Sequence, residues 1–371
     1  MRAFTIAIPD AELADLRTRL AATRFAPTLE DVGWDYGIED GFLRKFVAYW
    51  RDRYDWRAAE QRLNGFAQFI DTVAGETVHF VHVRGRGETN VPLLLTNGWP
   101  ANFVELLPLV PLLTTPRDGI AFDIVIPSLP GYGFSGQPRQ PGMNLTRVAP
   151  LWAELMSRLG YEKFLVSGSD MGAGVEMALV RDFADRLLGA HYVNVYFGFP
   201  QPEDPTPEEA DYFASLEWWN FAEGAYAMIQ GTKPATLAVG LNDSPAGLAA
   251  WILEKYRTWS DNDGDVESAF PLETLATIVS IFWFTQTIGS SVRLYKEAFA
   301  DTELPKKPPR HAVPHGILLP PRDYPAPRAW GERNLWNIVR WTELEKGGHF
   351  PALEVPEAMA EDIRAFHAQI G

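Results

Sequence analysis

The fold is decided by the stretch VSGSDMGAG, residues 166–174, which joins the apolar run 163–166 to a helix-like segment at 175–180. A strand that turns sharply into a helix, with a reactive side chain at its apex, has no room for side chains two residues before and after the apex. Gly168 and Gly172 meet that requirement around Asp170. The stretch therefore predicts a strand-turn-helix junction that presents a carboxylate, where such junctions usually present a serine.

Two other interpretations of the junction stay open at this point. One is an ordinary glycine-rich turn with a solvated Asp170. The other is a dinucleotide-binding turn, but the stretch lacks the glycine spacing of that fingerprint and places a negative charge where pyrophosphate would bind. A serine hydrolase is disfavoured because Ser169 stands one place early and no Gly-x-Ser-x-Gly motif occurs.

The segments around the junction alternate between short apolar runs and helical patterns. The runs are 92–96, 122–127, 164–167, 188–195, 313–319 and 338–344, and the helical patterns are 147–159, 175–180 and 358–366. This order predicts an α/β fold with a parallel sheet and crossover helices. Upstream, the first 65 residues are mostly helical in pattern, and a turn at 74–76 separates 69–73 from 77–83 as a hairpin.

The alternation stops between about 197 and 305, where aromatic residues and helix formers are dense. A helical insertion within an α/β sheet explains this, with 305–309 as the linker back to the sheet. We therefore expect an N-terminal extension (1–90), a first part of the core (91–196), a helical lid (197–305) and a second part of the core (306–371).

Composition excludes several kinds of protein. With 371 residues, of which 46% are hydrophobic, the chain can bury a sizeable core. Its 33 basic and 48 acidic residues give a net charge of −15, which disfavours nucleic acid as a partner. The absence of cysteine fits a reducing compartment. No signal peptide or membrane anchor is evident, so we expect a cytoplasmic protein, and the choice between monomer and homodimer stays open.

A histidine and an acid occur in the order that such folds use after the nucleophile. His349 follows two glycines on a loop after the 338–344 run, where a general base belongs. Asp323 follows the 313–319 run, where it can fix the imidazole tautomer, although it can equally be a solvated residue paired with Arg322. Upstream, the Trp99 and Met171 amides are candidates for an oxyanion hole, in a loop made tight by Gly98 and stiffened by Pro100, where a cis bond is one option.

The chain resembles the microsomal-type epoxide hydrolases, a branch of the α/β-hydrolase fold with a helical N-terminal extension. The resemblance covers nearly the whole chain and rests on seven stretches in the family's order, namely 97–100, 131–135, 168–172, 229–234, 241–245, 295–297 and 347–354. It implies that Asp170 is the nucleophile, His349 the base and Asp323 the orienting acid. It also implies that Tyr226 and Tyr295, which without it would be packing aromatics, protonate the epoxide oxygen.

The sequence departs from the family at two of these positions. Asn97 stands where a histidine is usual, which puts in question how the oxyanion loop is held. Met171 replaces a common tryptophan beside the nucleophile, and its flexible thioether gives the pocket a softer wall.

Aspartate suits epoxide chemistry because attack on a ring carbon forms an ester that water can hydrolyse, whereas a serine would form a stable ether. The expected product is a vicinal diol, made without metal or organic cofactor. His79 and His82 do not suggest a metal, since their spacing on a strand places them on opposite faces.

The aromatic lid favours a bulky, largely apolar epoxide. The alternatives are a haloalkane dehalogenase, which uses the same triad, and a catalytically silent binding protein.

Overall fold

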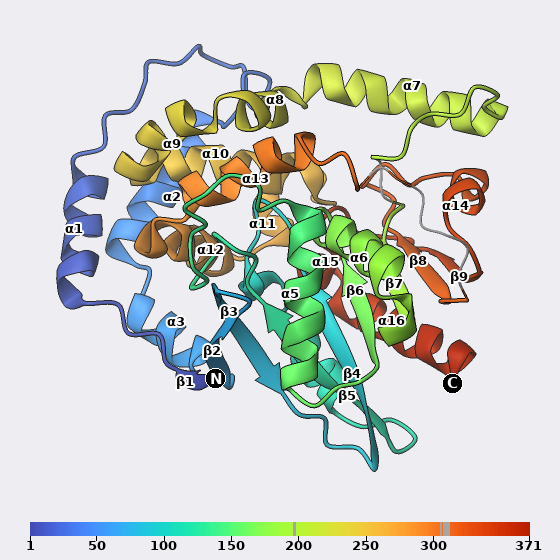
Figure 1. The fold of residues 1–371 in the computed structure, drawn as a ribbon. Coiled ribbons are helices and arrows are strands. Elements are labelled where there is room, and N and C mark those ends of the chain that lie inside the picture. The colour runs from blue at the N-terminus through green and yellow to red at the C-terminus, as the bar shows by residue number, and fades with distance from the viewer. Residues whose placement is uncertain (196–197, 305, 307–311) are drawn as a thin grey trace.

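A single nine-stranded sheet forms the centre of the molecule (Figure 1). The computed structural model describes residues 1–195, 198–304, 306 and 312–371. Along the sheet the strand order is β1-β2-β3-β5-β4-β6-β7-β8-β9. The strands are β1 (Arg2–Phe4), β2 (Gln68–Val73), β3 (Glu76–Val83), β4 (Thr89–Thr96), β5 (Ile120–Pro127), β6 (Phe164–Gly168), β7 (Leu187–Val193), β8 (His315–Leu319) and β9 (Ile338–Glu343).

The sheet is mixed, so the prediction of a parallel sheet is wrong at one end, where β1, β2 and β3 pair antiparallel. From β5 through β4 to β9 every pairing is parallel, as predicted. The predicted hairpin β2–β3 is present, but it joins the same sheet by pairing β3 antiparallel to β5, and β1 pairs antiparallel to β2. The N-terminal extension therefore contributes strands to the sheet of the core as well as helices.

Helices cover both faces of the sheet, as the fold class requires. In Figure 1, α5 (Leu145–Arg158) and α6 (Met171–Asp182) lie in front of the strands, and α16 (Pro356–Ile370) lies behind them. The helix α4 (Leu109–Thr114) packs against α16 and β5. The predicted α/β arrangement, a sheet with helices on both faces, is therefore confirmed. Shorter elements complete the core, namely η1 (Phe103–Leu106), η2 (Ala184–Arg186), α14 (Arg328–Asn334) and α15 (Pro351–Glu354).

The predicted insertion is helical and lies over the carboxyl ends of the parallel strands (Figure 1). Its helices are α7 (Pro207–Ala222), α8 (Ala225–Thr232), α9 (Pro234–Asp243), α10 (Pro245–Trp259), α11 (Val266–Ala269), α12 (Leu272–Thr285) and α13 (Ile288–Phe299). The linker predicted at 305–309 lies outside the described residues, apart from Lys306.

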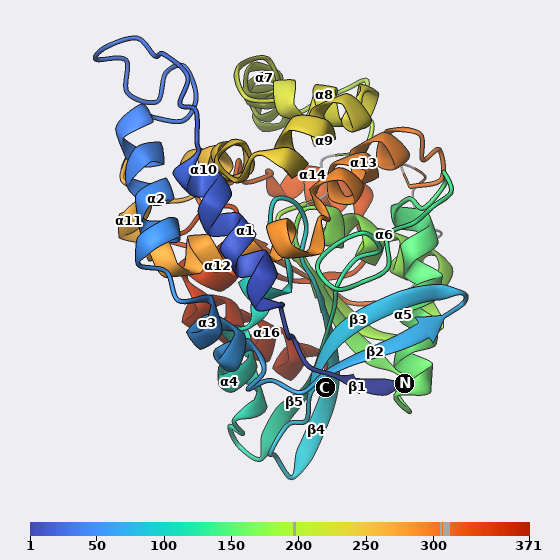
Figure 2. The same cartoon turned by 90° about the vertical axis from the view of Figure 1, so that its left-hand side faces the viewer.

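The N-terminal helices pack against this lid rather than against the core sheet alone. They are α1 (Asp10–Ala21), α2 (Asp40–Asp52) and α3 (Trp56–Leu63), and Figure 2 shows α1 and α2 beside α10 and α12. Two buried hydrogen bonds join the layers: the Trp50 indole N–H donates to Ser280 Oγ at 2.9 Å, and the Tyr54 and Thr277 hydroxyls are 2.9 Å apart. Because both pairs are buried, breaking them would leave unsatisfied polar groups.

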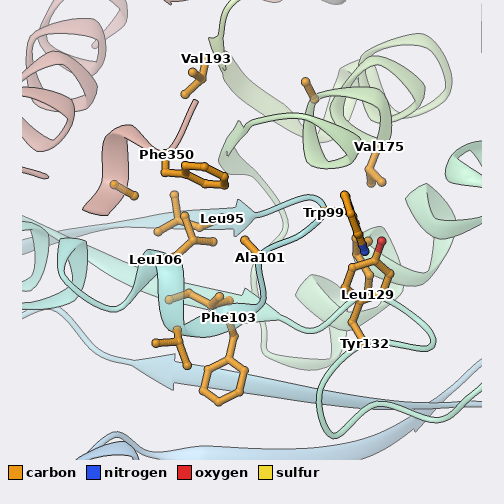
Figure 3. Packing of buried hydrophobic residues seen from close by; sticks show 14 of the residues in the cluster. Leu95, Trp99, Ala101, Phe103, Leu106, Leu129, Tyr132, Val175, Val193 and Phe350 are labelled. Carbon is orange, nitrogen blue, oxygen red and sulfur yellow. The ribbon is translucent and has the colours of Figure 1, made fainter. Parts of the chain in front are cut away.

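Local sequence signals explain where several elements begin. The side chain of Asn144 caps α5 by accepting from the Arg147 N–H, so the helix starts two residues before its predicted start. Thr206 and Glu209 form a capping box at the start of α7. Apolar side chains from separate elements then meet in one core, and Figure 3 shows Leu95, Leu106 and Phe350 among them.

No single helix in the described part of the chain is both long and apolar enough to span a membrane. The bent pair α12 and α13 passes that test when the two are taken together, by length and composition alone.

A buried carboxyl group lies beneath the strand-turn-helix junction. Glu176 of α6 is 1% exposed, and neither of its carboxyl oxygens has a hydrogen-bond partner among the described residues. The Tyr192 hydroxyl, whose pKa burial raises, also lacks a partner there. Burial raises the pKa of Glu176 well above its ordinary value, so the group is protonated in the folded state at neutral pH.

We expect Glu176→Gln to become progressively more stabilising, relative to the native chain, as pH rises. Above the ordinary glutamate pKa the unfolded chain loses a proton that folded Glu176 keeps, so the free energy of unfolding falls with rising pH. Glutamine removes this titration. In urea unfolding, the increase in the free energy of unfolding that Glu176→Gln causes should be about 1–3 kcal/mol larger at pH 8 than at pH 5. The exposed Glu154→Gln is the control, and an equal effect of Glu176→Gln at both pH values would refute the prediction.

Candidate active site

Asp170 lies at the apex of the predicted junction, between β6 and α6. Its backbone has φ 50° and ψ −122°, a strained conformation for a residue with a side chain. Glycine is required two residues before and after Asp170, because a Cβ at either position would clash with the backbone. A Cβ on Gly172 would lie 2.0 Å from the Thr96 carbonyl oxygen, and one on Gly168 would lie 2.8 Å from the Gly172 carbonyl carbon. The chain thus aims a carboxylate away from the end of the sheet.

The loop after β4 lies directly against this carboxylate. The Trp99 N–H donates to Asp170 Oδ1 at 2.9 Å, and the Trp99–Pro100 peptide bond is cis. A Cβ on Gly98 would lie 2.0 Å from the same oxygen, so a larger residue there would displace the carboxylate. Buried Asn97 donates its side-chain amide to the Gly98 carbonyl at 2.9 Å. Asparagine thus holds the loop in place of the histidine that the resemblance led us to expect.

The electrostatics of Asp170 reflect opposing influences. Burial raises the pKa of its carboxyl group from the ordinary value. The nearby charge of His349 and the backbone N–H groups of Trp99 and Met171 lower the pKa and favour the carboxylate. The two amides predicted to form an oxyanion hole therefore both act on this group.

His349 lies beside Asp170, and Asp323 lies on the other side of its imidazole. The two residues are on the loops that follow β9 and β8. Asp323 Oδ1 is 2.8 Å from His349 Nδ1, and Asp170 Oδ2 is 3.7 Å from His349 Nε2. Burial disfavours the charged imidazole, but the negative charge and hydrogen bond of Asp323, with the charge of Asp170, raise the His349 pKa to about 9. The imidazole therefore lies between two carboxylates, and is protonated at neutral pH.

Sequence reasoning missed a residue that holds the histidine loop in place. One carboxyl group, that of Glu354, accepts the N–H groups of Gly348 at 3.0 Å, Phe350 at 2.9 Å and Asp261 at 2.7 Å. It thereby ties the loop carrying His349 to the end of the lid helix α10. Glu354 lies in a stretch that matches the family, but only the folded backbone shows the three amides converging on it.

Glu105 is a second residue without a role in the sequence analysis. It is 2% exposed and lies in η1, a few residues after the oxyanion loop. Burial raises its pKa to about 8, against a lowering effect of the His349 charge. At neutral pH the group is therefore mostly neutral, and it adds little negative charge beside the imidazole.

The two tyrosines come together from different helices of the lid, Tyr226 from α8 and Tyr295 from α13. Both are buried, and the Tyr295 hydroxyl donates to that of Tyr226 at 3.4 Å. The Tyr226 ring stacks on Trp99 with centroids 5.4 Å apart, and Tyr295 meets Trp99 edge to face at 5.8 Å. Burial raises the pKa of both phenols, so they keep their protons at neutral pH. The tyrosines therefore lie over the oxyanion loop, near the carboxylate.

Within the described residues, no group of three or more histidine, aspartate or glutamate side chains is arranged to hold a metal ion. The ring of His79 has two hydrogen-bonding partners, Ser128 Oγ and Gln68 Oε1, each at 2.9 Å. His82 contacts the Tyr161 hydroxyl at 3.0 Å. Both histidines are thus engaged in the packing of the sheet.

The fold and the sequence place the chain in the α/β-hydrolase class. Residues 91–276 match the family described as "alpha/beta hydrolase fold", and residues 1–106 match the family described as "Epoxide hydrolase N terminus". Epoxide hydrolase 1 of Sus scrofa is 34% identical, over 99% of this chain and 88% of its own length.

Two solved structures are similar over the whole chain. The Aspergillus niger epoxide hydrolase has a TM-score of 0.89 and 34% identity, covering 96% of that chain. The juvenile hormone epoxide hydrolase of Bombyx mori has a TM-score of 0.93 and 30% identity, covering 94% of that chain. The chain belongs to the epoxide hydrolase family. The resemblance stated from the sequence is thus confirmed, and the dehalogenase and silent-protein alternatives give way to it.

Proposed function

We propose that this epoxide hydrolase opens its substrate through a covalent ester on Asp170 and releases a vicinal diol. One observation carries the proposal. The Asp170 carboxylate has one oxygen on the Trp99 N–H at 2.9 Å and the other 3.7 Å from the His349 imidazole, beneath two protonated phenols. The arrangement provides a nucleophile, an acid and a base close together.

In the first step Asp170 Oδ2 attacks a ring carbon and forms the ester bond. The carbon–oxygen bond of the ring breaks, its electron pair stays on the oxygen, and that oxygen takes a proton from a lid phenol. The other carboxyl oxygen, Oδ1, already accepts the Trp99 N–H and becomes the ester carbonyl. The negative charge that leaves Asp170 therefore appears on the tyrosine pair.

In the second step the imidazole of His349 takes a proton from water, which attacks the ester carbonyl carbon. The Trp99 and Met171 N–H groups stabilise the oxyanion, and Asp323 stabilises the imidazolium. Esterification prepares this step, because it removes the Asp170 charge that helps to raise the His349 pKa. The imidazolium then gives its resting proton to the phenolate formed in the first step, which restores the phenol and leaves a neutral imidazole to act as the base. Collapse of the intermediate breaks the bond from the ester carbon to Oδ2, and the imidazolium of His349 gives its proton to the released diol oxygen. The regenerated carboxyl group of Asp170 then gives the second proton of the water to His349, which restores the resting carboxylate and imidazolium.

We further propose that the substrate is a bulky, largely apolar epoxide. Aromatic side chains form one connected cluster where the lid meets the loop: Trp219, Trp259 and Tyr324 continue the group that begins with Trp99 and the two tyrosines. Such walls bind apolar surface and leave few polar groups to recognise a charged substrate.

A single turnover in oxygen-18 water tests the ester directly. With enzyme in excess, we expect the first diol to carry unlabelled oxygen, because its new hydroxyl oxygen comes from Asp170. Label should enter the diol only in later turnovers, after water has replaced the carboxylate oxygen. Full incorporation of label in the first turnover would indicate direct attack by water and would contradict the proposal.

A further inference from the structure

A buried ammonium group lies against one of the two lid tyrosines. Lys255 of α10 is only 6% exposed, and its Nζ lies 4.9 Å from the centre of the Tyr226 ring and 5.7 Å from that of Trp259. Its nearest charge is its neighbour Glu254, whose Oε2 is 2.5 Å from Nζ. Lysine is rarely buried to this extent, and the aromatic face takes the place of part of its hydration.

We propose that Lys255 is a positioning residue for ring opening, and that its ammonium group stabilises the phenolate that develops on Tyr226 as this tyrosine gives its proton to the epoxide oxygen. The inference rests on the proposed function, in which the lid tyrosines act as the acid. It also distinguishes the two tyrosines, because Tyr226 is the one that donates its proton to the epoxide oxygen.

The charge movement in the first step explains why a cation is useful at this place. Before the reaction the negative charge is on Asp170, and the charge of His349 stabilises that carboxylate. As the ester forms, Asp170 loses its negative charge, and the phenol that has given up its proton gains one. A cation over the receiving ring therefore favours the transition state over the ground state, and only such differential binding accelerates the chemical step.

The two tyrosines differ in their surroundings. Tyr295 donates its hydroxyl proton to the Tyr226 oxygen, which leaves the Tyr226 proton free for the substrate. In the described part of the chain, no lysine or arginine lies over the Tyr295 ring as Lys255 does over that of Tyr226. The other charges that act on Tyr226 are Asp170, Asp323 and Glu254, and all of them disfavour a phenolate. Lys255 opposes them, although Glu254 and the nearby Glu223 partly offset its charge.

Rapid-reaction kinetics with styrene oxide, followed by acid quench, can resolve ester formation from ester hydrolysis. We expect Lys255→Met to slow ester formation by about 10- to 100-fold and to leave hydrolysis within about twofold. Lys255→Arg keeps a cation over the ring and should recover most of the rate. The matched control is Lys296→Met, which removes an exposed lid cation next to Tyr295.

A double-mutant cycle separates this role from packing of the lid. If Lys255 acts through the Tyr226 phenol, Lys255→Met should have little further effect in a Tyr226→Phe background. An undiminished effect there would overturn the inference, as would equal slowing of both half-reactions or an unchanged rate of ester formation. If Lys255→Met unfolds at a lower temperature than the native chain, the same measurements are made with Lys255→Gln. Unchanged ring opening in the Tyr226→Phe, Tyr295→Phe double variant would instead refute the acid role in the proposed function.

Discussion

Asp170→Ala is expected to abolish diol formation, with a loss of about 10⁴-fold or more in kcat/KM. The substitution removes the atom that forms the ester, and no neighbouring carboxylate can replace it. Asp323 is engaged with His349 at 2.8 Å on the far side of the imidazole, and Glu105 is buried and mostly neutral. Diol production from racemic styrene oxide, measured by chromatography, checks the loss.

The control for this variant is Asp182→Ala, at the exposed carboxyl end of α6, the helix that Asp170 precedes. Alanine at 170 retains the strained backbone, so the variant should unfold at a temperature close to that of the native chain. Retention of even a few per cent of the native rate by a folded Asp170→Ala protein would contradict the nucleophile assignment, because catalysis by the oxyanion hole and lid alone is far weaker.

His349→Gln is expected to stop turnover after ring opening, so that one equivalent of substrate is bound as an ester. Ester formation needs the carboxylate, the Trp99 N–H and the lid phenols, and all of these remain. Hydrolysis needs a base within reach of water at the ester, and that base is lost. Intact-protein mass spectrometry should show a gain equal to the mass of the epoxide, and digestion should place it on the peptide that contains Asp170.

Ester formation in this variant should be slower than in the native chain and should recover as pH rises. The charge of His349 lowers the Asp170 pKa, so its removal lets burial raise that pKa further. A larger fraction of Asp170 is then protonated at low pH and does not attack. The control is His82→Gln, which changes a histidine of the sheet. Continued diol release by His349→Gln, or an adduct on another peptide, would contradict the scheme.

The junction, the base loop and the acid could be placed from the sequence because each depends on a local pattern. Glycines on either side of Asp170 are a steric requirement, and His349 and Asp323 each follow a predicted strand. Strand order left Asp323 open as a solvated residue, and the family resemblance favoured it as the acid. The helical lid was evident from composition. These features lie within short stretches of chain, and one sequence is enough to show them.

The parts that sequence reasoning missed depend on long-range contacts. The strand β1 has three residues, too few to show a period of two, and the pairing of β3 with β5 is visible only in the folded sheet. Glu354 and Lys255 act on groups that are brought to them by other segments. The helical period of α10 gives no indication that its lysine faces the Tyr226 ring.

The bracing of the lid by the N-terminal helices has a consequence for turnover. Trp50 and Tyr54 bond to α12 from outside, while Glu354 ties the end of α10 to the core. We expect these contacts to limit movement of the helical insertion, which also carries Tyr226 on α8 and Tyr295 on α13. We therefore expect substrate and product to exchange through local openings and not through displacement of the whole insertion.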